Sequence, residues 1–134
     1  MIGALDHVGI AVRDLDAAVQ RYRTAFGIEP AHRETVDHQG VEEVLFPVGE
    51  SYVQLLRPLG PTTPVGRFLE KRGEGMHHIG YRVDNVRAAL DRLRDQGHRL
   101  VDEAPRPGSR GTMVAFVHPK AFDGVLIELV EEPG

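Results

Sequence analysis

The sequence predicts an α+β fold made of two tandem copies of one module, each with a strand, a helix and three further strands. Two observations support this fold class. When His7 is placed on His78, the residues that follow coincide repeatedly, so that Gly9 falls on Gly80. In each copy, an apolar stripe with helical spacing is then followed by segments with the apolar–polar alternation of strands.

The two repeats are expected to cover about residues 4–58 and 75–131 and to form a single domain. A chain of 134 residues is a normal length for one domain with a substantial core. Residues 59–74 would join the repeats through a short helix, with Pro64 near its start and Phe68 packing inward. Because one module has only a single helix, two modules that share a mixed, mostly antiparallel sheet form a better core.

The composition narrows the possible functions. Hydrophobic residues make up 41% and charged residues 27% of the chain, as in an ordinary soluble globular protein, and the net charge of −4 disfavours a nucleic-acid partner. The absence of cysteine excludes thiolate nucleophiles and cysteine-ligated zinc. No apolar run is long enough for a membrane span, and no signal peptide is recognisable, so we expect a cytoplasmic protein without membrane association.

The first element of each copy is a strand, near residues 5–12 and 75–83, and a helix follows it. Asp14 and Asn85 precede the helices and can accept a hydrogen bond from a free N–H of the first turn. Gly27 and Gly97 follow the last turns, where a left-handed residue is favoured. The apolar residues have the spacing i, i+4, i+7 of a helix that packs on a core, namely Leu15, Val19 and Tyr22, and Val86, Leu90 and Leu93.

Six further strands follow from segments with a period of two. In the first copy they are expected near residues 31–36, 41–48 and 52–57, and in the second near residues 99–103, 112–118 and 125–130. Turn residues separate them, most clearly Gly40, residues 49–51 and the loop of residues 105–111.

The first strand of each copy carries a histidine on the face that should point away from the helix. Side chains alternate across a strand, so His7 and Gly9 share one face, as do His78 and Gly80. The glycine leaves open space beside each histidine. A single histidine in a strand is more often a structural, hydrogen-bonded residue, but two at equivalent positions favour a shared site.

The last strands repeat this arrangement with Gln54 and Glu128, each between apolar neighbours. A carboxylate is costly to bury unless it is paired or bound to a metal, although a glutamate of an edge strand can also point to solvent. Together with His7 and His78, these residues form a set of nitrogen and oxygen donors. Such a set suits a divalent ion in octahedral geometry with two positions left for water or substrate, whereas structural zinc favours closed coordination and thiolates.

Several segments resemble the vicinal oxygen chelate superfamily, whose paired βαβββ modules form a cupped sheet around a metal. They are LDHVGIAVRDLDAA, QGVEEVLFP, VQLLRPLG, FLEKRGEGMHHIGYRVDNV, HPK and GVLIELVEE, and they cover almost the whole chain. The His-x-Gly strands alone indicate only the superfamily. The EGMHHIGYRVDN and HPK…GVLIELVE segments resemble the methylmalonyl-CoA epimerases within it.

The resemblance implies that His7, Gln54, His78 and Glu128 are metal ligands, while the neighbouring His77 points to the other face and is structural. It suggests cobalt(II) or manganese(II) as the metal, with zinc or nickel as further occupants. It also implies a small-molecule substrate, methylmalonyl-CoA, and a homodimer.

The reaction implied by the resemblance is the interconversion of (2R)- and (2S)-methylmalonyl-CoA through an enolate. A divalent ion bound to the thioester and carboxylate oxygens would stabilise the enolate as it forms. The family's base follows a Gln-Gly-Val segment and matches Glu43 better than Glu42, which would lie on the opposite face. Epimerisation needs a second acid or base on the other side of the carbon, and Glu128, although also a ligand, is one candidate.

Other functions remain open at this point. A glyoxalase I-like lyase would share the fold and the metal, and a metal-free ligand-binding protein of the same superfamily would need no ligand set. The phosphates of coenzyme A, or the free carboxylate of the substrate, could meet Arg106, Arg110 or Lys120, although ordinary surface charge explains each equally well. The turn of residues 108–111 could offer backbone N–H groups to an anion.

Overall fold

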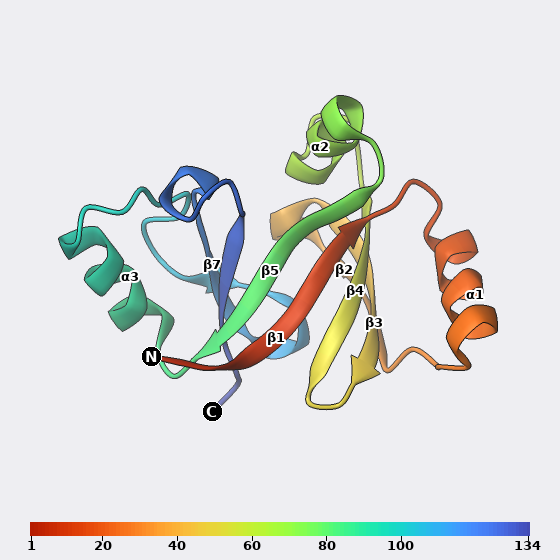
Figure 1. Ribbon diagram of the computed structural model, residues 1–134, viewed down its shortest axis with the longest axis horizontal. Coiled ribbons are helices and arrows are strands. Elements are labelled where there is room, and N and C mark those ends of the chain that lie inside the picture. Colours follow the sequence, from red (N-terminus) through yellow and green to blue (C-terminus); the bar gives the residue numbers. More distant parts are fainter. The chain divides into compact units, whose positions relative to one another are not determined.

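The computed structural model describes all residues, 1–134, and contains both predicted modules (Figure 1). The first module consists of β1 (Ile2–Ala11), α1 (Leu15–Phe26), β2 (His32–Val36), β3 (Val41–Val48) and β4 (Ser51–Pro58). The second consists of β5 (Gly75–Val83), α3 (Val86–Asp95), β6 (Arg106–Pro107), β7 (Met113–Val117) and β8 (Ile127–Glu131), and α2 (Pro64–Arg72) stands between the modules. The predicted α+β fold is therefore confirmed.

The chain forms two compact units whose boundaries fall inside strands. One unit comprises residues 7–77, and the other comprises residues 1–6 together with residues 78–134. We refer to them as the N-terminal unit and the C-terminal unit. None of the helices is long and apolar enough to cross a membrane.

In the N-terminal unit the strands have the order β2-β3-β4-β1, with β1 parallel to β4 and the other neighbours antiparallel. Helix α1 packs on one face of this sheet, beside β3 and β4 (Figure 1). Helix α2 packs at one end of the opposite face through Val65 and Leu69. The core under α1 consists of Val12, Leu15, Ala18, Val19, Val44, Phe46 and Leu55.

The C-terminal unit has the same design. Its strands have the order β5-β8-β7-β6, with β5 parallel to β8 and the other pairs antiparallel. Helix α3 covers one face, and the core beneath it consists of Val83, Val86, Ala89, Leu90, Ala115, Val117, Ile127 and Leu129. In both units, therefore, one face of the sheet is buried by a helix, and the side chains of the other face alternate with that apolar set.

The predicted helix ends are also observed. Asp14 accepts a hydrogen bond from the N–H of Ala17, and Asn85 accepts one from the N–H of Ala88. Gly27 ends α1 in the left-handed conformation, with φ of 64°. These contacts satisfy backbone groups that a helix end otherwise leaves without a partner.

The strand predicted near residues 99–103 is wrong, because only Leu100 of this segment forms a β-bridge. The N–H of Asp102 donates to the carbonyl of Phe116, but the side chain of Asp102 accepts the N–H of Phe116 at 2.8 Å. A side chain thus takes the place of the backbone acceptor that a strand would offer. The short strand β6 instead lies within the segment predicted as a loop.

A surface ion-pair network joins three strands of the N-terminal unit. The carboxylate of Glu42 on β3 lies 3.0 Å from Arg33 on β2 and 3.0 Å from Arg57 on β4. Hydrogen bonds from Arg33, and then from Arg57, lower the pKa of the Glu42 carboxyl group from its usual value. The ionised form of Glu42 therefore stabilises the folded state.

Replacing Glu42 with glutamine should lower the free energy of unfolding by about 1 kcal/mol at pH 7, since both partners are partly exposed. Because the folded-state pKa is lowered, this stabilisation is present above the unfolded-state pKa and disappears as the pH falls through the folded-state pKa. Urea unfolding at several pH values measures the difference. The exposed Glu70 gives a control, Glu70→Gln, for which we expect almost no change; an equal loss in both variants would contradict the prediction.

Candidate functional site

In the N-terminal unit, His7 and Gln54 lie on the sheet face that α1 leaves uncovered. Strands β1 and β4 run parallel and pair Gly9 with Gln54. His7 stands two residues before Gly9 on β1, so its side chain lies on the same face as that of Gln54. Both side chains are buried, with 5% of His7 and 4% of Gln54 exposed. The amide oxygen of Gln54 makes no hydrogen bond within the chain.

The C-terminal unit repeats this geometry with His78 and Glu128. Strands β5 and β8 pair Gly80 with Glu128, and Nε2 of His78 lies 3.1 Å from Oε1 of Glu128. Both side chains are 3% exposed. In each unit, a glycine thus stands opposite a long polar side chain and a histidine stands two residues before that glycine, as the sequence repeat predicted.

Glu43 lies on the same face of the N-terminal unit as Gln54. Strands β3 and β4 pair Glu43 with Leu56 and Leu45 with Gln54, so these four side chains point to one side of the sheet. Only 1% of Glu43 is exposed. Glu42 points to the other face, where Arg33 and Arg57 hold it, so the two neighbouring glutamates lie on opposite faces, as the sequence predicted.

The two neighbouring histidines of β5 have different surroundings. The ring of His77 meets the ring of Phe68 edge-on at 5.0 Å, within the N-terminal unit. The ring of His78 meets Phe116 edge-on at 5.5 Å, within the C-terminal unit. His77 thus packs against α2.

Two further residues of the C-terminal unit, Phe116 and Asp6, were not predicted from the sequence. Phe116 pairs with Glu128 across β7 and β8 and shares its face. Asp6 is completely buried and lies 2.8 Å from Arg82 and 3.1 Å from Arg110. Arg110 is thus held by a buried carboxylate. For Phe116, the alternation in the MVAFV strand was the only signal in the sequence.

The donor atoms fit a divalent metal ion. Imidazole nitrogens with amide and carboxylate oxygens, and no thiolate, are a donor set for borderline or hard divalent ions. A buried amide oxygen without a hydrogen-bond partner is uncommon in a folded protein, and a bound ion is one of the groups that can satisfy it. Gln54 supplies such an oxygen, and the contact between His78 and Glu128 supplies a nitrogen and an oxygen on one face of one sheet.

The chain matches a known family model over most of its length. Residues 6–116 match the family model described as the Glyoxalase/Bleomycin resistance protein/Dioxygenase superfamily. The chain belongs to this superfamily. Its two βαβββ modules are those of the vicinal oxygen chelate fold.

Several members of the superfamily are similar to this chain over almost their whole length. The ethylmalonyl-CoA/methylmalonyl-CoA epimerase of Cereibacter sphaeroides is 42% identical over 131 residues, which are 96% of this chain and 98% of the relative. Two solved structures, each 41% identical, have a TM-score of 0.97 and cover 100% of this chain and 97% of theirs. They are a variant of Streptomyces coelicolor methylmalonyl-CoA epimerase in complex with 2-nitronate-propionyl-CoA, and a methylmalonyl-CoA epimerase in complex with methylmalonyl-CoA and NH4+.

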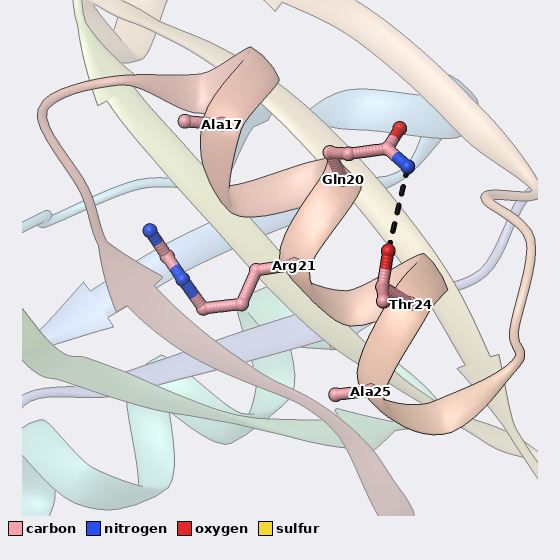
Figure 2. Close-up of a pocket in the computed structure, with 5 residues that line it drawn as sticks. All are labelled: Ala17, Gln20, Arg21, Thr24 and Ala25. Atoms are coloured by element: carbon pink, nitrogen blue, oxygen red, sulfur yellow. Dashed lines mark hydrogen bonds between the residues drawn. The ribbon is translucent and has the colours of Figure 1, made fainter.

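A surface depression over α1 is unrelated to these donors. Figure 2 shows its lining, all from α1, with Gln20 donating to the hydroxyl of Thr24 at 3.4 Å and Arg21 as the only charged residue. Helix α1 covers the opposite face of the sheet from Gln54. In this superfamily member, the depression therefore offers neither a set of metal ligands nor an acid–base pair.

Replacing Gln54 with leucine should raise the free energy of unfolding by about 1 kcal/mol when metal is removed with EDTA. The reason is that leucine has a similar volume but no polar atom, so the desolvation penalty of a buried amide oxygen without a partner is removed. Thermal unfolding in EDTA measures the effect. Gln20→Leu on the surface of α1 is the matched control and should change little, and a clear loss of stability in Gln54→Leu would contradict the prediction.

Proposed function

We propose that this protein is a methylmalonyl-CoA epimerase, an isomerase that interconverts the (2R) and (2S) forms of a CoA thioester. The observation that carries the proposal is the buried Glu43 on the same face as Gln54, within the fold of the superfamily. The similarity to epimerases over nearly the full chain supports it. A cytoplasmic location, expected from the sequence, and a homodimer, implied by the resemblance, are part of the same proposal.

His7, Gln54, His78 and Glu128 would hold one divalent ion, with cobalt(II) or manganese(II) as the first candidates. Their equivalent positions in the two units and the nitrogen and oxygen donor set support this assignment. When bound, the ion would supply positive charge to the thioester and carboxylate oxygens of the substrate.

Glu43 and Glu128 are the proposed acid–base pair. In one direction, the Glu43 carboxylate takes the proton from C2 of the substrate, and a protonated Glu128 delivers a proton to the opposite face of the same carbon. In the reverse direction the roles exchange, so the protein ends each turnover with one proton on the pair. Burial of both side chains keeps bulk water from competing for the enolate.

Proton exchange at C2 tests the function directly. We expect the metal-loaded protein, given a single epimer of methylmalonyl-CoA in D2O, to incorporate deuterium at C2 and to form the other epimer. NMR and chiral chromatography follow the two events. If exchange does not exceed that of the metal ion alone, the epimerase function is wrong, and a glyoxalase-like activity on a glutathione adduct becomes the next function to measure.

The Glu43→Gln variant should slow epimerisation by about 10²- to 10⁴-fold, the usual contribution of a positioned acid or base. Glu42→Gln is its matched control, because Glu42 is the neighbouring glutamate, points to the other face and is held by two arginines. We expect Glu42→Gln to retain the wild-type rate. Equal rates in the two variants would remove Glu43 from the mechanism.

Metal binding should stabilise the fold. A metal ion at 100 times its Kd adds about 2.7 kcal/mol when it binds only the folded state. We therefore expect cobalt(II) or manganese(II) to raise the Tm of EDTA-treated protein, and His78→Ala to lose most of this increase. His77→Ala is the matched control and should keep the increase; a loss of the increase in His77→Ala alone would exchange the roles of the two histidines.

A further inference from the structure

A row of side chains crosses the ligand-bearing face of the C-terminal unit. Strand pairing places Gly80 opposite Glu128, and Glu128 opposite Phe116. On the outer strand β6, Arg106 pairs with Val114, the residue two before Phe116 on β7, so Arg106 is a diagonal neighbour of Phe116 on the same face. The row thus runs from the histidine and glutamate on β5 and β8, through an aromatic ring, to a cation at the sheet edge.

Two contacts hold this row together. The guanidinium carbon of Arg106 lies over the ring of Phe116, 5.6 Å from its centroid. The same ring meets His78 edge-on, with 5.5 Å between ring centroids. The cation is therefore separated from the proposed ligand His78 by a single aromatic ring.

Arg106 is positioned but not enclosed. Its Nε lies 3.4 Å from Oδ2 of Asp102, and that same oxygen accepts the backbone N–H of Phe116 at 2.8 Å. About a third of the side chain, 32%, is exposed, while its Nε is buried.

We propose that Arg106 binds an oxyanion of the substrate at the end of this row. A planar guanidinium matches carboxylate and phosphate oxygens, and a guanidinium that already stacks on a ring loses less freedom on binding. Arg110, the other arginine of this loop, is committed to the buried Asp6 at 3.1 Å and lies 3.6 Å from Glu132. The proposal rests on the proposed function, because it takes a CoA thioester as the ligand.

A methylmalonyl thioester offers two sources of oxyanion, its free carboxylate and the phosphates of coenzyme A. Neighbouring strands lie about 4.8 Å apart, so the ring of Phe116 on β7 starts about 10 Å from β5, across two strand spacings. The free carboxylate is one carbon from the thioester group and stays beside the reacting atoms. The phosphates lie at the far end of a long flexible arm, so the position of Arg106 beyond Phe116 favours a phosphate.

Calorimetric titration of the full-length protein with two ligands tests the proposal and distinguishes the sources. Coenzyme A carries the phosphates without the carboxylate, and methylmalonyl-pantetheine carries the carboxylate without phosphates. We expect Arg106→Gln to weaken coenzyme A binding about tenfold or more, the range for a lost charge-assisted contact, and to leave methylmalonyl-pantetheine binding unchanged. The opposite pattern would assign the oxyanion to the carboxylate and still support the proposal.

Unchanged affinity for both ligands in Arg106→Gln, or no binding of either ligand to the wild type, would overturn the proposal. Arg94→Gln is the matched control. It removes the same charge, but from α3, the helix that covers the opposite face of the C-terminal sheet. Arg106→Lys keeps the charge and should recover part of the affinity. The dependence of affinity on salt should also flatten in Arg106→Gln, which a loss of packing alone would not produce.

This experiment is independent of the proton-exchange test because it measures binding without turnover. If exchange at C2 is absent but Arg106→Gln still weakens coenzyme A binding, the epimerase function fails while the oxyanion site stands. If exchange is present and Arg106→Gln binds both ligands like the wild type, the function stands and the oxyanion site is wrong.

Discussion

Parallel pairing between the first and the last strand of each module is the constraint on which the proposed chemistry depends. It places Gly9 beside Gln54 in one unit and Gly80 beside Glu128 in the other. A slip of one residue in either pairing would turn the polar side chain toward the helix and an apolar one away from it. The apolar stripes of α1 and α3 oppose such a slip, because each must stay buried against its own sheet.

The polar residues are therefore stabilised by the apolar faces behind them. Burying Glu43, Gln54 and Glu128 at exposures of 1% to 4% carries a desolvation cost. Each unit offsets this cost with a closed apolar cluster beneath its helix. Glu42 and Asp6 are held by arginines, Glu42 by Arg33 and Arg57 and Asp6 by Arg82 and Arg110.

Features that repeat in the sequence could be predicted, because the repeat adds an independent constraint to each local pattern. The helix caps Asp14 and Asn85 and the face shared by His7 and Gly9 are examples. The segment of residues 99–103 could not, since its strand-like alternation is overridden by the bond between the Asp102 side chain and the backbone of Phe116. The stack of Arg106 on Phe116 depends on where β6 pairs, and the sequence predicted a loop there.

The two units differ in one proposed ligand, Gln54 in the N-terminal unit and Glu128 in the C-terminal unit, and this difference affects the charge of the proposed metal site. Two imidazoles and an amide are neutral ligands, so Glu128, in the direction in which it is ionised and accepts the proton, would be the only ligand to carry a negative charge. A divalent ion held by this set would retain one positive charge for the substrate, whereas a glutamate in place of Gln54 would cancel it. A malonyl thioester is itself an anion and gains a second charge as its α-proton leaves. Glutamine at position 54 therefore keeps an oxygen donor at the repeated position without adding a negative charge. The site would then retain the positive charge that stabilises an enolate.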